Sequence, residues 1–268
     1  MQAPSNIATP PILANKHPAS PSEFLPSALL REARRQKRLA PVAVPPICLL
    51  DPDGDLVRAL RQERRANSFA GWPCYHTELD TFALGRHEIG IIGRVVGAPF
   101  AVLVAEELFA SGCTFLLSLT SAGQIVAAGS PPYFVVIERA LRDEGTSYHY
   151  AAPADFAHAD PALVVLAADA LGPRGIVGAT WTTDAPFRET AAAIEAAKQR
   201  GILAVEMEAA ALYAFARARQ ARVLCLAHVT NTMGRSGDDF EKGEADGTAD
   251  ALGVLEAVTR AVRAAYKL

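Results

Sequence analysis

After residue 46, the chain alternates between short apolar runs and longer segments whose apolar positions recur at helical spacing. The short runs predict buried strands, and the longer segments predict amphipathic helices. The predicted strands cover 47–50, 88–92, 114–119, 176–181, 203–205 and 223–229. The predicted helices cover 56–64, 99–111, 133–143, 161–170, 189–200, 209–219 and 249–266. Regular alternation of this kind indicates an α/β fold in which helices cover both faces of one sheet.

Ligands of open α/β sheets bind beyond the carboxyl ends of the strands. In this chain the rule points to the loops at 51–58, 93–98, 120–123 and 230–236. Residues of these four loops are therefore expected to meet around one ligand.

The first 46 residues differ in composition from the rest, because they hold nine of the 18 prolines. We expect residues 1–46 to form a Pro-rich, partly disordered arm. Residues 25–39 predict a short basic helix within it. The arm lacks the apolar core of a secretory signal. Residues 47–268 are expected to form a single catalytic domain.

Composition excludes several classes of function. The net charge of −3 gives no basic field for nucleic acid. No apolar run reaches the ~18 residues that a membrane helix needs. The four cysteines have irregular spacing and form no CxxC pair, which favours reduced thiols in a cytoplasmic protein without a metal site. We therefore expect no contact with nucleic acid or membrane.

The segment Val205-Glu-Met-Glu-Ala-Ala-Ala211 places two carboxylates where a short strand enters a helix. In an extended chain Glu206 and Glu208 lie on the same face. One carboxylate accepts two hydrogen bonds, so it can bind both cis hydroxyls of a ribose. Met207 offers an apolar surface for the sugar. The alternative interpretation is a helix start that favours acids.

The segment Gly54-Asp-Leu-Val-Arg58 predicts an anion-binding turn. Glycine lets an anion approach the backbone, and Asp55 is the expected N-cap of the helix that follows. The positive end of that helix and Arg58 then face the anion. A turn with a surface arginine is the alternative.

These two segments, together with Ser118-Leu-Thr-Ser-Ala-Gly123 and Val229-Thr-Asn-Thr232, resemble the nucleoside phosphorylase family. That family includes hexameric purine nucleoside phosphorylases, uridine phosphorylases and related nucleosidases. The resemblance covers roughly residues 47–267. It implies a three-layer α/β/α sandwich with a central mixed, partly barrel-like sheet.

The resemblance also assigns roles around the sugar and the phosphate. It implies that Glu208 binds the ribose 2′- and 3′-hydroxyls, with Glu206, Met207 and Thr120 close to the substrate. The residues it places at the phosphate are Gly54, Arg58, Gly97 and Ser121. Ser118 stands where the family has a phosphate-binding Arg, and Arg94 is our candidate to replace that charge.

At the base, the resemblance places Asn231 where purine enzymes have an Asp. An amide cannot act as a general acid, but it can hydrogen-bond a base that gains negative charge. The segment 180–190 is similar to the family's base pocket, where Phe187 can stack on the base and Arg188 can bind a carbonyl oxygen. His149 lies in a third segment, 144–149, that resembles a region near the base and ribose.

The implied activity is phosphorolysis of a uridine- or oxopurine-type ribonucleoside to free base and ribose 1-phosphate. Nucleoside and phosphate are then the partners, and no cofactor is required. The resemblance also implies a homo-oligomer, either a dimer or a hexamer built as a trimer of dimers. Two alternatives stay open. They are a nucleosidase in which Asp53 or Asp55 activates water, and a catalytically silent nucleoside-binding module.

Overall fold

The computed structural model of the chain describes residues 9–232 and 247–268. The strands are β1 (Ile47–Asp51), β2 (Ala66–Ser68), β3 (Asp80–Leu84), β4 (His87–Gly93), β5 (Phe115–Gln124), β6 (Tyr133–Asp143), β7 (Phe156–His158), β8 (Gly175–Thr183), β9 (Ile202–Glu206) and β10 (Val223–Thr232). The α-helices are α1 (Pro26–Lys37), α2 (Asp55–Gln62), α3 (Ala98–Ala110), α4 (Ser147–Tyr150), α5 (Pro161–Leu171), α6 (Ala191–Gln199), α7 (Ala209–Arg219) and α8 (Thr248–Tyr266). The short 3₁₀ helices are η1 (Gly172–Arg174) and η2 (Pro186–Arg188).

The sheet is mixed and partly closed. Its strand order is β10-β6-β8-β9-β5-β1-β4-β3-β2, and β10 also pairs with β5. The strands β5, β10, β6, β8 and β9 therefore form a closed ring, from which β1, β4, β3 and β2 extend as an open sheet. This is the α/β fold that the sequence pattern predicts, with the partly barrel-like sheet that the resemblance implies.

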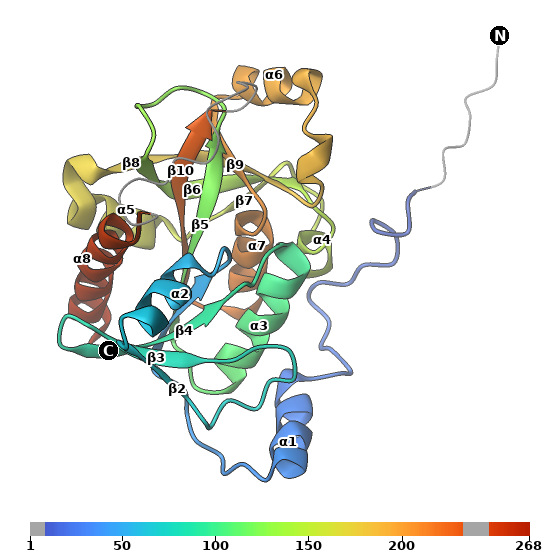
Figure 1. The fold of residues 1–268 in the computed structure, drawn as a ribbon. Helices are drawn as coiled ribbons and strands as arrows, with labels where there is room; N and C mark the ends of the chain where they lie inside the picture. Colours follow the sequence, from blue (N-terminus) through green and yellow to red (C-terminus); the bar gives the residue numbers. More distant parts are fainter. Residues whose placement is uncertain (1–8, 233–246) are drawn as a thin grey trace.

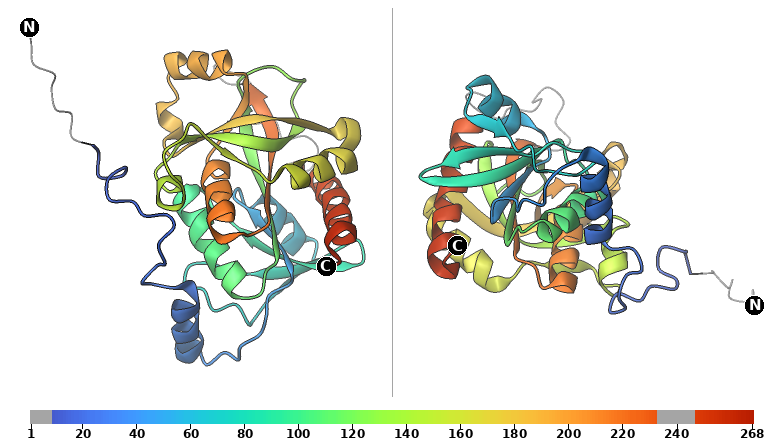
Figure 2. Two further views of the ribbon diagram at one scale, coloured as in Figure 1. Left: turned by 180° about the vertical axis from the view of Figure 1, so that it is seen from behind. Right: turned by 90° about the horizontal axis from the view of Figure 1, so that it is seen from below.

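Helices cover the sheet on both sides, which gives three layers (Figures 1 and 2). On one side α3 and α7 pack over a core that contains Leu108, Leu116 and Phe215. On the other side α2, α5 and α8 pack over a second core that contains Leu49, Leu117 and Val258. Leu116 and Leu117 are neighbours on β5 and enter opposite cores, as the alternation of side chains along a strand requires.

One predicted element is wrong in type. The segment 133–143 is the strand β6, not a helix. It pairs in parallel with β8 and antiparallel with β10, and its register against β8 shifts between Ile137 and Arg139. This irregularity interrupts the alternation of buried and exposed positions, so the sequence pattern loses the period expected of a strand.

Two expected loops are also shorter than the sequence indicates. Residues 120–123 belong to β5, and residues 230–232 belong to β10, so both strands reach into the predicted ligand region. Residues 233–236 of the last predicted loop lie outside the described residues. The predicted helix in the arm is present as α1, which begins at Pro26.

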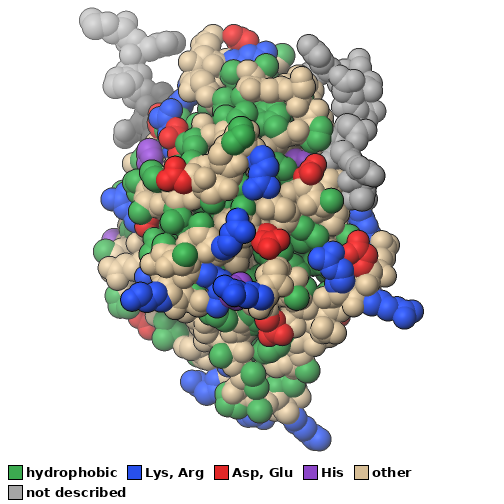
Figure 3. All heavy atoms as spheres, turned by 90° about the vertical axis from the view of Figure 1, so that its left-hand side faces the viewer, with side chains coloured by type: hydrophobic (Ala, Val, Ile, Leu, Met, Phe, Trp, Pro, Cys, Tyr) green, Lys and Arg blue, Asp and Glu red, His purple; other side chains and the backbone are tan. Residues whose placement is uncertain are grey.

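Residues 9–25 precede α1 and run beside the body of the protein (Figure 1). Arg219 of α7 donates to the Ser22 hydroxyl at 3.4 Å and forms an ion pair with Glu106 of α3. On the face drawn in Figure 3, basic and acidic side chains are interspersed. No helix among the described residues is long and apolar enough to span a bilayer.

Candidate active site

Strand register brings the motif segments on β5, β9 and β10 to one end of the ring. Val205 on β9 lies opposite Gly123 on β5, and Asn231 on β10 lies opposite the same glycine. On the other side of β9, Glu206 lies opposite Thr182 on β8. Segments that are far apart in sequence therefore meet around Glu206 and the residues that follow it.

Glu206 is buried, and both of its carboxylate oxygens are held by the protein. Oε1 accepts hydrogen bonds from the hydroxyls of Thr180 and Thr182, at 3.0 and 2.5 Å. Oε2 accepts from the backbone amides of Glu208 and Ala209, both at 2.7 Å. The structure thus gives Glu206 a positioning role at the start of α7, and the substrate contact that the resemblance implies stays a prediction.

The two threonines were not recognised in the sequence as partners of Glu206. Thr180 and Thr182 are two residues apart on β8, so their side chains point to the same face of the sheet. Both are fully buried. Their spacing was the available signal, but the strand that would face them could not be identified from the sequence.

Glu208 is 1% exposed and differs from Glu206 in how its oxygens are used. Oε1 accepts a hydrogen bond from the Gly97 amide at 2.7 Å. Oε2 is buried and finds no hydrogen-bond partner among the described residues. A buried carboxylate oxygen without a donor is costly, so this atom is suited to accept hydrogen bonds from a ligand.

Gly97 has a backbone φ of 89°, which favours glycine, and it precedes α3. Its amide donates to Glu208, although the resemblance placed Gly97 at the phosphate. The glycine loop therefore orients the carboxylate in this structure. Met207, between the two glutamates, is half-buried.

Burial raises the pKa of Glu208 to about 8, and the nearby charges of Glu206 and Asp53 act in the same direction. The hydrogen bond from the Gly97 amide and the nearby Thr120 hydroxyl oppose this shift. Burial also raises the pKa of Glu206, and its four hydrogen-bond donors oppose that shift. Two ribose hydroxyls need an ionised acceptor, and the proton must leave before both can donate.

This pKa predicts a pH dependence for substrate use. As the pH rises from 6 to 8, kcat/KM for a nucleoside should rise, approaching about tenfold per pH unit, and then level off. The slope should disappear in Glu208→Gln, which has no proton to lose. A profile of kcat/KM against pH that is flat between 6 and 8 in the wild-type enzyme would contradict this assignment.

The turn after β1 is organised by Asp51, which the sequence reading left out of the site. Its carboxylate accepts hydrogen bonds from the amides of Gly54 at 3.2 Å and Val57 at 2.9 Å. Burial raises the pKa of Asp51 to about 7. Gly54, with φ of 79°, is the N-cap of α2, so the expectation that Asp55 is the cap is wrong. The left-handed conformation at this position explains the glycine.

Gly54, Arg58 and Arg94 line one cavity of about 650 Å³, together with Arg61 and His76. A Cβ atom at Gly54 would lie 2.8 Å from Cγ of Arg94, so the arginine packs directly over the glycine turn. Arg94 has a positive φ of 63°, which is unusual for a residue with a side chain. Arg58 forms an ion pair with Asp55 at 2.8 Å.

Ser121 is not part of this cavity. Its amide and its hydroxyl both donate to the carboxylate of Asp53, at 3.0 and 2.9 Å. Beside them lies a space of about 30 Å³ lined by Asp51, Asp53, Asp55 and His228. The predicted phosphate ligands are therefore divided, with the cations on one side of the turn and Ser121 on the other.

Ser118 is buried in β5, and its hydroxyl finds no hydrogen-bond partner among the described residues. Thr120, two residues further along the strand, is buried next to Glu208. Ser118, where the resemblance leads us to expect an arginine, is thus an uncharged part of the sheet.

The predicted base-binding residues lie at the end of β10 and in the segment that follows β8. Asn231 is half-buried at the end of β10. Phe187 and Arg188 belong to η2, and Phe187 is 99% exposed, so it is not a core residue. Stacking of Phe187 on a base stays a prediction.

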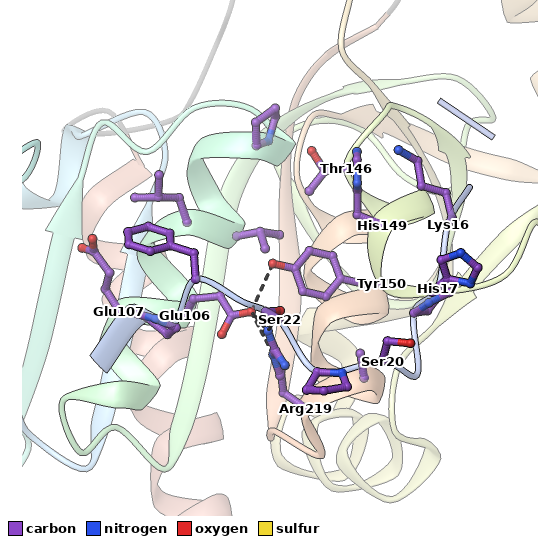
Figure 4. A pocket seen from close by; sticks show the side chains of 18 of the residues that line it. Lys16, His17, Ser20, Ser22, Glu106, Glu107, Thr146, His149, Tyr150 and Arg219 are labelled. Atoms are coloured by element: carbon purple, nitrogen blue, oxygen red, sulfur yellow. Dashed lines mark hydrogen bonds and ion pairs between the residues drawn. The ribbon is translucent and has the colours of Figure 1, made fainter. Parts of the chain in front are cut away.

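His149 lies elsewhere. It lines a cavity of about 730 Å³ between α3, α4 and the N-terminal arm, with Lys16 and His17 of the arm close to it (Figure 4). Glu106 accepts a hydrogen bond from Tyr150 at this cavity, at 3.1 Å. The structure therefore does not bring His149 together with Glu208. Across the described ranges, no group of three His, Cys, Asp or Glu side chains could hold a metal ion.

The sequence profile described as "Phosphorylase superfamily" matches residues 46–268. The chain belongs to the phosphorylase superfamily. The match begins next to β1 and leaves the arm outside.

One sequence relative is named as a uridine phosphorylase and another as a purine nucleoside phosphorylase. A uridine phosphorylase from Thermococcus kodakarensis is 27% identical over 188 residues, which are 61% of this chain and 68% of that protein. A DeoD-type purine nucleoside phosphorylase from Dichelobacter nodosus is 26% identical over 153 residues, which are 54% of this chain and 64% of the relative.

Solved structures show the same fold. Uridine phosphorylase from Vibrio fischeri ES114 matches with a TM-score of 0.67 and 21% identity, over 85% of this chain and 94% of that one. The same enzyme in complex with 6-hydroxy-1-naphthoic acid gives a TM-score of 0.65 at 21% identity, over 83% and 91% of the two chains.

Proposed function

We propose that this phosphorylase-superfamily chain cleaves the N-glycosidic bond of a ribonucleoside by phosphorolysis. The observation that supports this best is the buried Oε2 of Glu208, which lacks a donor among the described residues. A ribose offers two adjacent hydroxyl donors that match one carboxylate. Met207 lies directly after β9, next to Glu208, and would pack against the sugar.

In the proposed reaction, a phosphate oxygen attacks C1′ while the bond from C1′ to the base nitrogen breaks. The bonding electrons leave with the base, and the sugar passes through a state with oxocarbenium character. Glu208 holds the sugar in place, and Arg58 and Arg94 provide positive charge for the phosphate. The rate enhancement would come from positioning and electrostatics, without a covalent enzyme intermediate.

We propose a uridine- or oxopurine-type base. Asn231 cannot supply a proton to the leaving base, but its amide can donate a hydrogen bond to a base that gains negative charge. Arg188 is exposed on η2 and would provide a second donor. A pyrimidine or an oxopurine carries carbonyl oxygens that can accept hydrogen bonds from both side chains.

Hydrolysis by water is the second candidate. It is favoured by Ser118, whose buried hydroxyl provides no positive charge for a phosphate at that part of the sheet. Release of base would then give ribose in place of ribose 1-phosphate.

Turnover of uridine and inosine with and without inorganic phosphate separates these functions. We expect base release that depends on phosphate and produces ribose 1-phosphate. Equal rates in the absence of phosphate, with ribose as product, would reject phosphorolysis. Tight nucleoside binding without any turnover would reject both reactions and favour a binding module.

A further inference from the structure

The turn that carries the expected phosphate ligands is rich in acids. Residues 51–55 have the sequence Asp-Pro-Asp-Gly-Asp, so three carboxylates lie within five residues. Two of them contact groups that an incoming anion would use. Asp55 pairs with the Arg58 guanidinium, and Asp53 accepts from Ser121.

The contact between Asp53 and Ser121 has the form of anion binding. The backbone amide of Ser121 donates to one carboxylate oxygen and its hydroxyl donates to the other, at 3.0 and 2.9 Å. An amide and a hydroxyl from one residue are the kind of donors that hold a phosphate oxygen pair. The Asp53 carboxylate, an anion of the same chain, thus already occupies these two donors.

Asp53 is exposed, so its carboxylate can turn into solvent without opening the core. Turning it away would leave the Ser121 donors facing the turn that also presents Gly54. Asp53 and Ser121 line the same small space beside the turn. A phosphate that binds the two Ser121 donors must therefore take the place of the Asp53 carboxylate that holds them now.

We propose that Asp53 is a specificity-determining residue that competes with inorganic phosphate for the donors of Ser121. This inference rests on the proposed function for its consequence in catalysis. Phosphate binding must displace the Asp53 carboxylate and also overcome its negative charge. The apparent affinity for phosphate then depends on a carboxylate that is not itself a phosphate ligand.

The test measures phosphate binding directly, by isothermal titration calorimetry with inorganic phosphate, in the wild-type enzyme, Asp53→Ala and Asp53→Asn. Removal of the carboxylate in Asp53→Ala should tighten phosphate binding by about tenfold, which is roughly the effect of one hydrogen bond to a charged group. Asp53→Asn loses the charge but keeps an acceptor, so an intermediate gain is expected.

Glu63→Gln is the matched control. Glu63 follows α2 and pairs with Arg65 at the surface, so its replacement changes the net charge by the same amount without touching Ser121. Its phosphate affinity should equal that of the wild-type enzyme. An equal gain in Glu63→Gln and Asp53→Ala would overturn the proposal, because overall charge would then explain both.

Steady-state kinetics separate this proposal from the proposed function. In Asp53→Ala the KM for phosphate should fall and the KM for the nucleoside should stay unchanged. Tighter phosphate binding in Asp53→Ala, combined with a wild-type enzyme that cleaves no nucleoside, would support the competitor role and reject phosphorolysis. Unchanged or weaker phosphate binding in a folded Asp53→Ala would overturn the competitor role. A loss of phosphate-independent hydrolysis in this variant, without a gain in phosphate affinity, would overturn it as well.

Discussion

Replacement of Glu208 by alanine is expected to abolish nearly all nucleoside cleavage while the chain stays folded. The carboxylate would accept two ribose hydroxyls, and hydrogen bonds to a charged group contribute about 1.5–3 kcal/mol each. The loss in kcat/KM should therefore reach about 10²–10⁴-fold. Steady-state kinetics with the best nucleoside substrate measure the effect.

The stability of this variant at different pH values tests the raised pKa of Glu208. The pKa of Glu208 is raised in the folded state, so ionisation destabilises the wild-type protein as the pH rises from its unfolded pKa to about 8. Glu208→Ala and Glu208→Gln lack this penalty. Their Tm relative to the wild-type protein should increase between pH 5 and pH 9.

Glu195→Ala is a suitable control for the loss of a glutamate, because its side chain is 60% exposed on α6. It should retain wild-type kinetics. Nearly normal turnover by Glu208→Ala would show that the sugar is held elsewhere, and the assignment of the site would then be wrong.

Replacement of Glu206 by alanine is expected to lower stability more than any other single change in the site. It would leave two buried threonine hydroxyls and two backbone amides without their acceptor. Each unsatisfied buried group costs about 1–3 kcal/mol, so a loss of about 3 kcal/mol or more in the free energy of unfolding is expected even after water enters. Urea denaturation followed by circular dichroism measures it.

Glu206→Gln keeps the shape and one carbonyl oxygen, so its loss of stability should be smaller than that of Glu206→Ala. A change below about 1 kcal/mol in Glu206→Ala would mean that the four hydrogen bonds contribute little beyond their exchange with water. The positioning role of this residue would then lose its support.

Much of the fold can be predicted because most elements follow a simple period. The helix expected at 209–219 is α7 with the same bounds, since its apolar residues lie between a strand end and a polar Arg-Gln stop. The strand β6 shows where this fails. Its first five residues, Tyr133 to Ile137, are aromatic or β-branched and favour a strand, but charged residues later in the segment follow a helical spacing. Pairing with β8 and β10 decides between the two patterns.

Part of the candidate site could likewise be predicted from the sequence, and part could not. The motif around Glu208 is local in sequence, so the carboxylate and its neighbouring methionine could be predicted from the residues and the resemblance. The partners of Glu206 and the occupation of Ser121 by Asp53 depend on strand register and on the direction of a loop side chain. Neither is encoded by a spacing within one segment.

The closed ring of five strands has a consequence for how a substrate can enter. At Thr182, β8 is paired with β6 on one side and with β9 on the other, and at Gly123, β5 is paired with β9 and β10. A strand that is paired on both sides cannot slide or tilt without breaking two ladders at once. This part of the floor is therefore held on both sides, and we expect the motion that admits a ligand to lie in connecting segments such as η2 with its exposed Phe187.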